Sequence, residues 1–203
     1  MDNNKALHIC GIRVDLVQIS EVVSIMSSWI EKMAPGNYIV LSNAYDAVLS
    51  MRDQKLNDAV KYSSLSVPDG GSLLLAARLY GKRLNKRVYG PDLLIEFIKS
   101  TQNKDYKHFF YGATENTINK MIDKLKEQFP GLNISGTYAP PFRSLTEEEN
   151  SMVVERINNS GADVIWVGLG CPKQEIWMYE HKNTVNIPVM VGIGAAFDFL
   201  SGV

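Results

Sequence analysis

The chain has 203 residues, 45% of them hydrophobic, and a formal net charge of −1, which predicts one globular domain without the basic field of a nucleic-acid-binding protein. Its two cysteines cannot form a disulfide framework and its three histidines are scattered, so the sequence predicts no metal site. It has no signal-peptide pattern and no run of about 18 apolar residues, so we expect a cytoplasmic protein, either soluble or peripheral at a membrane.

In the first half of the chain, short β-branched or aromatic runs alternate with helical patterns. This alternation predicts parallel strands that are joined by helical crossovers. In chain order we expect a strand at 7–12, a helix capped by Ser20 with an apolar stripe from Val22 to Met33, a strand at 38–41, a helix with Ala44, Ala47, Val48 and Met51 on one side, a strand at 65–67, and helices at 72–80 and from Gly90.

The second half repeats the alternation more clearly, and Thr146 with Glu149 has the spacing of a capping box. The fold class that we predict is α/β, with a Rossmann-like parallel sheet and helices on both faces. Two small lobes, residues 1–104 and 105–203, are expected to form a cleft. The elements expected here are strands at 108–111, 132–136, 164–167 and 189–193, helices at 114–129, from Thr146 and at 174–181, and the beginning of a further element at 197–200.

Polar side chains follow two strands of the first half. Ligands of open α/β sheets bind beyond the carboxyl ends of the strands, so these positions are candidate site residues. The amide of Asn43, with Ser42 beside it, suits sugar hydroxyls or an acetamido group, although either residue could instead cap the following helix. Asp69, between Pro68 and two glycines, could take a proton from an attacking hydroxyl or, alternatively, cap the next helix.

Two strand-to-helix turns of the second half could hold a nucleotide diphosphate through backbone N–H groups. Neither turn is a Walker loop or a GxGxxG fingerprint, and no acidic residue ends the next strand, so we expect no nicotinamide and no other cofactor. For the first turn, an ordinary βα connection is an equally good explanation. The candidate nucleotide-binding residues are Gly112, Ala113 and Thr114 in the first turn and Gly168, Gly170, Lys173 and Glu175 in the second, with Gln174 as a substrate-binding candidate beside them.

Charged or nucleophilic residues near other strand ends are further candidates. Arg87 could pair with a phosphate or a carboxylate, and Asp92 could bind substrate or simply complement a helix dipole. Cys171 could be a nucleophile, but no histidine is close in sequence, so a small buried thiol is favoured. The role of Asp198 stays open. The chain contains no Asp-x-Asp pair, so a leaving diphosphate would be stabilised by helix N-termini and by cations such as Lys173, without a metal ion.

Taken together and in this order, these segments resemble the WecG/TagA/CpsF family of bacterial glycosyltransferases. Each match is weak singly, but the ordered set is specific and covers nearly the whole chain. The matching segments are 42–44, 68–70, 87–93, 109–113, 130–132, 140–142, 168–175 and 192–202.

The resemblance implies an inverting, metal-independent transfer of N-acetylmannosamine, or a related sugar, from a UDP-sugar to a polyprenyl-diphosphate-linked sugar. The product would serve teichoic acid, capsule or common antigen synthesis at the inner face of the cell membrane. Asp69 matches the family's proposed base, while Asn43 and Gln174 match residues of its sugar pocket. The family's Thr/Ser-x-Asn motif is met only in part, because Ser42 directly precedes Asn43.

Members of this family carry a C-terminal basic and aromatic appendage that is thought to touch the membrane. The chain ends before that appendage, so we expect weak or absent activity and weak membrane binding, and exposed apolar surface that could support a homo-oligomer. Two other functions stay open. A nucleotide-sugar epimerase or dehydrogenase would contain a tightly bound nicotinamide, and a non-catalytic subunit would bind UDP-sugar without transferring the sugar.

Overall fold

The computed structural model describes residues 6–82 and 86–202, and its central element is a six-stranded parallel sheet. The strands are β1 (Ala6–Ile9), β2 (Ile12–Asp15), β3 (Asn37–Ser42), β4 (Leu65–Pro68), β5 (Lys107–Gly112), β6 (Asn133–Tyr138), β7 (Val164–Gly168) and β8 (Val189–Gly192). The helices are α1 (Ile19–Glu31), α2 (Ala44–Ser50), α3 (Gln54–Lys61), α4 (Gly71–Leu79), α5 (Gly90–Ser100), α6 (Glu115–Gln128), α7 (Glu147–Asn159), α8 (Lys173–His181) and α9 (Ala196–Ser201). The predicted Rossmann-like α/β class is confirmed.

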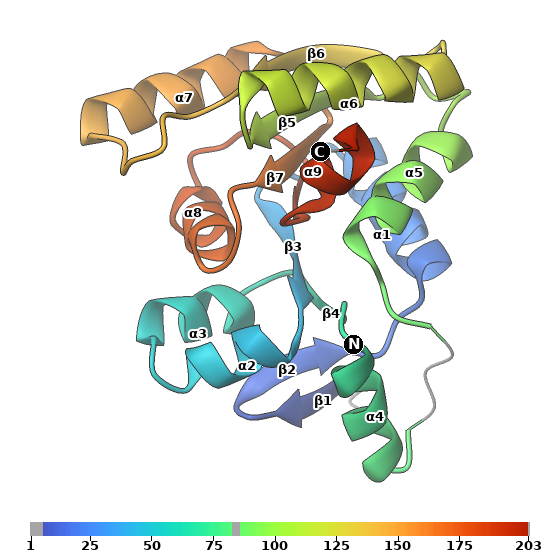
Figure 1. Ribbon diagram of the computed structural model, residues 1–203, viewed down its shortest axis with the longest axis vertical. Coiled ribbons are helices and arrows are strands. Elements are labelled where there is room, and N and C mark those ends of the chain that lie inside the picture. Colours follow the sequence, from blue (N-terminus) through green and yellow to red (C-terminus); the bar gives the residue numbers. More distant parts are fainter. Residues whose placement is uncertain (1–5, 83–85, 203) are drawn as a thin grey trace.

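The two halves of the chain contribute to one continuous sheet, with the strand order β4-β3-β8-β7-β5-β6 (Figure 1). The junction is the pairing of β8 with β3, in which Tyr38 lies opposite Met190 and Ile39 opposite Val191. Because every pairing in this sheet is parallel, all six strands present their carboxyl ends at the same edge. The expected lobes are therefore joined through the sheet, and the candidate residues of both halves follow strands that end at that edge.

Helices cover both faces of the sheet. The helices α1, α5, α6 and α9 pack on the face that contains Phe110 and Trp166, while α3, α7, α8 and the β1–β2 hairpin pack on the face that contains Tyr111 and Val167. Successive residues of a strand point to opposite faces, so strands covered on both sides are apolar throughout, which explains their clear sequence signal. No helix of the described ranges is long and apolar enough to cross a membrane.

The strand predicted at 7–12 is wrong, because this segment forms a two-stranded antiparallel hairpin outside the main sheet. Cys10 and Gly11 make its turn with φ angles of 50° and 85°, a conformation that glycine adopts without strain. The Asp15 carboxylate accepts a hydrogen bond of 2.8 Å from the backbone N–H of Ser66, and this bond fastens the hairpin to β4.

The predicted N-terminal cap of α7 is confirmed, and the predicted cap of α1 is wrong. The capping box of Thr146 and Glu149 is present at the beginning of α7. In α1, by contrast, the cap is Gln18 rather than Ser20, because the Glu21 carboxylate accepts a 2.9 Å hydrogen bond from the Gln18 backbone N–H. A glutamate three residues after the cap is the common feature of both helices.

The helix predicted after β3 differs from expectation in length and in burial. It ends at Ser50 as α2, and a separate helix, α3, follows it. Of the four residues expected on its apolar side, Ala47 is buried, whereas Ala44, Val48 and Met51 are exposed. An exposed apolar face therefore lies next to the carboxyl edge of the sheet.

Candidate active site

Asp69 and Asn43 lie side by side at the carboxyl ends of β4 and β3. The Asp69 backbone N–H donates to the carbonyl of Ser42 at 2.8 Å, which holds the two strand ends together. A Cβ atom added to Gly70 would lie 3.4 Å from the Cβ of Asn43, so the two turns are in direct contact. The backbone N–H of Val88 donates to the carbonyl of Pro68 at 2.7 Å and brings the segment with Arg87 to the same edge.

Asn43 is the N-terminal cap of α2, which is one of the two roles that the sequence leaves open for it. Its side-chain oxygen accepts hydrogen bonds from the backbone N–H groups of Tyr45 at 2.7 Å and Asp46 at 3.3 Å. The cap uses only the oxygen of the amide, so ligand binding through the amide nitrogen is compatible with it. The Ser42 side chain, the neighbouring candidate, is fully buried and shares a 2.9 Å hydrogen bond with the Ser66 hydroxyl.

The Asp69 carboxyl group is half-buried, and its Oδ1 atom is buried without a hydrogen-bond partner in the described structure. Burial raises the pKa of Asp69 to about 6, Arg87 acts in the opposite direction, and Asp46 and Asp92 raise it further. Arg87 is exposed, with its guanidinium 4.4 Å from the centre of the Tyr89 ring. Asp69 is thus a carboxyl group that is ready to gain or lose a proton near neutral pH.

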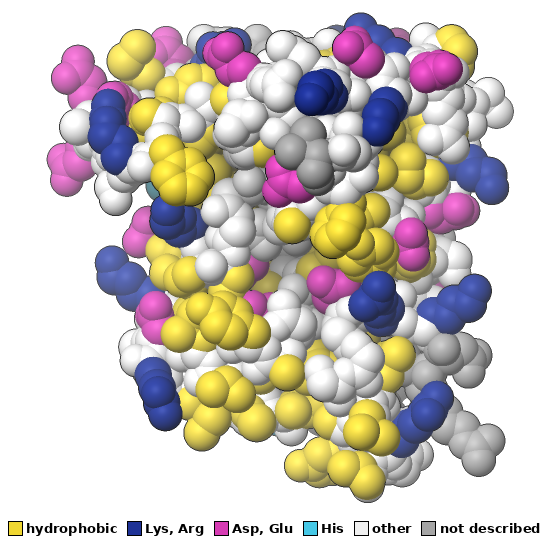
Figure 2. Space-filling model, in the orientation of Figure 1, with side chains coloured by type: hydrophobic (Ala, Val, Ile, Leu, Met, Phe, Trp, Pro, Cys, Tyr) yellow, Lys and Arg dark blue, Asp and Glu magenta, His cyan; other side chains and the backbone are white. Residues whose placement is uncertain are grey.

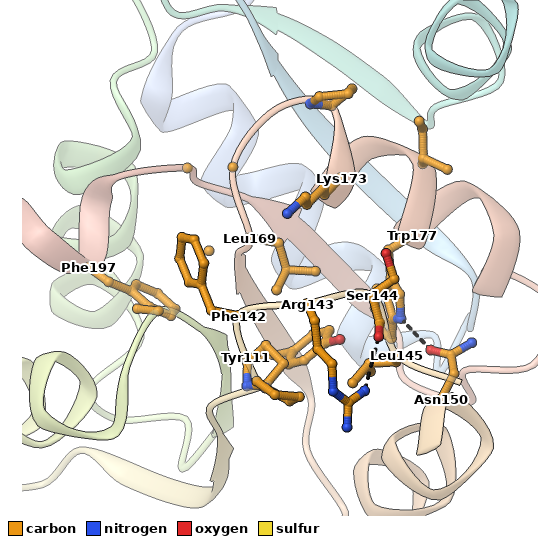
Figure 3. Close-up of a pocket in the computed structure, with 18 of the residues that line it drawn as sticks. Tyr111, Phe142, Arg143, Ser144, Leu145, Asn150, Leu169, Lys173, Trp177 and Phe197 are labelled. Atoms are coloured by element: carbon orange, nitrogen blue, oxygen red, sulfur yellow. Dashed lines mark hydrogen bonds between the residues drawn. The ribbon is translucent and has the colours of Figure 1, made fainter. Parts of the chain in front are cut away.

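A cavity of about 670 Å³ opens at the ends of β5, β7 and β8, and Asn43, Asp69 and Arg87 are not among the described residues that line it. A volume of this size is in the range of small-molecule sites. Figure 3 shows side chains of its wall, among them Tyr111, Leu169 and Trp177, with Phe142 and Arg143 of the loop that follows β6. The predicted nucleotide-binding residues that line this cavity are Ala113, Thr114, Gly168, Gly170 and Lys173.

Gly112 and Glu175, which were predicted to bind the nucleotide, are not in the cavity wall. Gly112 is buried with a φ angle of 133°, and a Cβ atom there would lie 2.3 Å from the carbonyl oxygen of Gly168. Gly112 therefore allows β5 and β7 to approach each other directly below the cavity. The Glu175 side chain is 1% exposed and lies in the protein interior.

Gln174 and Glu175 form a buried pair that supports the turn after β8. The Gln174 side-chain nitrogen donates to Glu175 Oε1 at 2.7 Å, and its oxygen accepts from the backbone N–H of Gly194 at 3.0 Å. Gly194 itself lines the cavity, so Gln174 lies directly behind the wall. Burial raises the pKa of Glu175 to about 7, which favours a neutral carboxyl group in this network.

Cys171 is not activated as a nucleophile. Burial raises the pKa of its thiol far above the usual range, and the neighbouring carboxyl groups of Glu175 and Asp46 raise it further. These effects outweigh the position of Cys171 just before α8, where a helix dipole alone would lower the thiol pKa. The interpretation as a structural thiol, favoured from the sequence, is the one that this environment supports.

Asn150 and Trp177 are cavity residues that sequence reasoning missed. Trp177 Nε1 donates to Asn150 Oδ1 at 3.0 Å, and the Trp177 ring stacks on His181 with centroids 4.8 Å apart. Lys173 Nζ lies 5.9 Å from the centre of the Phe142 ring, so a cation and an aromatic ring meet at the opening. Phe142 belongs to a matched sequence segment, but no local pattern connects Asn150 with Trp177, which are 27 residues apart.

The described residues contain no group of three or more His, Cys, Asp or Glu side chains that could hold a metal ion. At this edge the Asp69 carboxyl group, whose pKa is raised by burial, is accompanied by exposed cations and by two strand-to-helix turns that line the cavity. This combination suits proton removal from a hydroxyl group and binding of a phosphorylated ligand.

A sequence model described as the glycosyl transferase WecG/TagA/CpsF family matches residues 7–203. Among curated proteins, an N-acetylglucosaminyldiphosphoundecaprenol N-acetyl-beta-D-mannosaminyltransferase of Bacillus spizizenii is 29% identical over 167 residues, which are 82% of this chain and 63% of that protein. A Bacillus subtilis protein of the same name is 27% identical with the same coverage. A Staphylococcus aureus protein of that name is 27% identical over 98% of this chain and 77% of its own length. The chain thus spans 63% of the length of the two Bacillus relatives.

Proposed function

Because the chain belongs to the WecG/TagA/CpsF family of glycosyltransferases, we propose that it transfers N-acetylmannosamine, or a related sugar, from a UDP-sugar to a polyprenyl-diphosphate-linked sugar. The names of the three relatives specify an N-acetylmannosaminyl group and a diphosphoundecaprenol-linked acceptor. The placement of Asp69 supports this activity most directly, because its carboxyl group lies at the strand ends beside Asn43 and one of its oxygens has no hydrogen-bond partner among the described residues.

The donor nucleotide occupies the cavity in this proposal. The turns that contain Ala113 and Gly170 are strand-to-helix connections that line the cavity, and such turns before helix N-termini favour the binding of phosphate groups. Lys173, in the first turn of α8, adds a positive charge at the opening. The segment 105–203 accordingly holds the nucleotide, and the segment 1–104 supplies Asn43 and Asp69 to the sugar and the acceptor.

The reaction is a single displacement. Asp69 removes the proton from an acceptor hydroxyl while the hydroxyl oxygen forms a bond to the anomeric carbon. The bond between that carbon and the diphosphate breaks, and its electron pair leaves with UDP, so the anomeric configuration inverts. Backbone N–H groups, Lys173 and Arg87 stabilise the negative charge that develops on the diphosphate.

The acceptor places this reaction at a membrane surface, with the chain acting as a peripheral protein at the inner face. The sugar polymers that contain such units are teichoic acid, capsule and common antigen, as the family resemblance implies. Association into a homo-oligomer stays a prediction, which sedimentation of the chain in solution would test.

We expect the transfer rate to fall on the acid side with a midpoint near pH 6. The base must be deprotonated, and burial raises the pKa of Asp69 to about 6, so kcat/KM should drop about tenfold per pH unit below that value. The measurement is the pH dependence of kcat/KM, with UDP binding measured over the same range as the control. A rate that stays constant down to about pH 4 would identify the base as an ordinary exposed carboxylate, or as another group.

The direct test is transfer from radiolabelled UDP-N-acetylmannosamine to a synthetic lipid-diphosphate-linked N-acetylglucosamine, with and without a metal chelator. We expect labelled disaccharide-lipid and no loss of activity with chelator. Tightly bound nicotinamide absorbance together with epimerised sugar would identify an epimerase or dehydrogenase instead. UDP binding without transfer under all conditions would indicate a non-catalytic subunit.

A further inference from the structure

Exposed apolar side chains gather on two helices that begin at the candidate active site. On α2 and its C-terminal cap the exposed fractions are 63% for Tyr45, 55% for Val48 and 68% for Met51. On α4 and its C-terminal cap they are 59% for Leu75, 83% for Leu79 and 63% for Tyr80. Hydrophobic side chains spread over the lower half of the molecule in Figure 2, where Figure 1 draws α2 and α4. We call these six residues the α2–α4 surface.

The spacing of these residues shows that each helix has an apolar face turned to solvent in addition to its buried face. Val48 and Met51 follow Tyr45 at three-residue intervals, and Leu79 follows Leu75 at four, so each set lies on one side of its helix. The opposite sides bury Ala47 in α2, and Leu73 and Ala77 in α4. Exposed apolar side chains gathered in this way mark an interaction site for a protein or a membrane.

Charge distinguishes between these two kinds of partner. Among the described residues from 44 to 87, all side chains that are both charged and exposed are basic, although the whole chain has a net charge of −1. The acidic side chains of this stretch are buried or half-buried, and Lys55 Nζ lies 3.8 Å from the carboxylate of Glu180. The six exposed basic residues are Arg52, Lys55, Lys61, Arg78, Lys86 and Arg87.

We propose that the α2–α4 surface lies on an anionic lipid bilayer. Apolar side chains among basic ones are the combination that binds such a surface, because the former enter the boundary with the acyl chains and the latter attract anionic headgroups. This contact involves only residues of the described chain. This inference rests on the proposed function, because it names the lipid surface that would hold the acceptor of that reaction.

The α2–α4 surface lies next to Asp69, so a bilayer bound there would bring a lipid-linked acceptor close to the proposed base. Asn43 caps α2 and Gly70 caps α4, and the two caps touch beside the Asp69 carboxyl group. A lipid-linked sugar that rises from a bilayer beneath these helices would meet the base directly. The polyprenyl chain could then stay in the membrane while its sugar reacts.

The test is sedimentation of the chain with vesicles of phosphatidylcholine, with or without about one third phosphatidylglycerol. We expect binding to the anionic vesicles that weakens with added salt. The double variant Leu75→Ser/Leu79→Ser should lose affinity by about tenfold or more, because it removes the most exposed apolar side chains of α4. The matched control is Met152→Ser, whose side chain is 63% exposed on α7 in an acidic stretch with Glu147, Glu148 and Glu155, and it should bind as the parent chain does.

Three results would overturn this assignment. The first is equal affinity of the double variant and the control for anionic vesicles, and the second is no affinity of the parent chain. The third is a dimer in solution that the double variant dissociates, since the surface would then cover a second copy. Transfer to a short-chain, water-soluble acceptor separates this inference from the proposed function. Normal transfer without vesicle binding contradicts only the α2–α4 surface, and vesicle binding without any transfer contradicts only the proposed activity.

Discussion

Replacing Asp69 by asparagine should lower kcat by about 10²- to 10⁴-fold while UDP binds nearly as before. Asparagine keeps the size and the hydrogen-bonding ability of the side chain but cannot take up the proton of the acceptor hydroxyl. The nucleotide cavity lies at the ends of β5, β7 and β8, and Asp69 is not among its lining residues, so its affinity for UDP should be spared. Single-turnover transfer and calorimetric titration with UDP would measure the two effects separately.

Unfolding measurements provide the control for this variant. A folded-state pKa that is raised to about 6 means that the charged carboxylate is disfavoured in the folded protein, so the stability associated with neutral Asp69 is lost as the pH rises through 6. Asp69→Asn should therefore be more stable than the parent chain above that pH, and inactivity could not be ascribed to unfolding. Asp123→Asn, an exposed change on α6, should keep full activity. Near-normal turnover of Asp69→Asn would remove this carboxyl group from the mechanism.

Gly112→Ala should destabilise the fold by about 3–5 kcal/mol, the largest stability effect that we expect from a single methyl group. Gly112 has a φ angle of 133°, which side chains rarely tolerate, and the new Cβ atom would lie 2.3 Å from the carbonyl oxygen of Gly168. Both groups belong to the backbones of adjacent strands, β5 and β7, so neither can move aside without disturbing the sheet. Denaturant unfolding of the purified variant would give the change in free energy.

Gly131→Ala is the matched control for this substitution. Gly131 has no neighbouring heavy atom within 4 Å of an added Cβ and no positive φ angle, so its replacement should change the free energy of unfolding by less than about 1 kcal/mol. Because the turn after Gly112 lines the cavity, Gly112→Ala should also weaken UDP binding in whatever fraction of the protein stays folded. Equal stability of the two variants would show that β5 and β7 can separate at little cost.

Several site features depend on contacts between residues far apart in the chain. The Gln174 side chain supports the cavity wall by accepting a hydrogen bond from the Gly194 backbone N–H. Trp177 donates a hydrogen bond to Asn150, which is 27 residues away in the sequence. The hydroxyl of Ser42 is buried beside that of Ser66, which belongs to the neighbouring strand β4. Sequence spacing carries no information about these pairs, because the order and register of the strands determine which side chains meet.

The sequence by itself determined the α/β class, most strand positions and the edge of the sheet at which the candidate site lies. These features follow from local causes, namely apolar periodicity, caps and turn residues, together with the rule that parallel strands share a carboxyl edge. Only the tertiary structure decided that 7–12 is a hairpin, that both halves share one sheet and that α2 and α4 expose apolar faces. It also decided that burial, rather than any neighbour in sequence, raises the pKa of Asp69. Solvent exclusion and strand order are properties of the assembled chain, so no local pattern could reveal them.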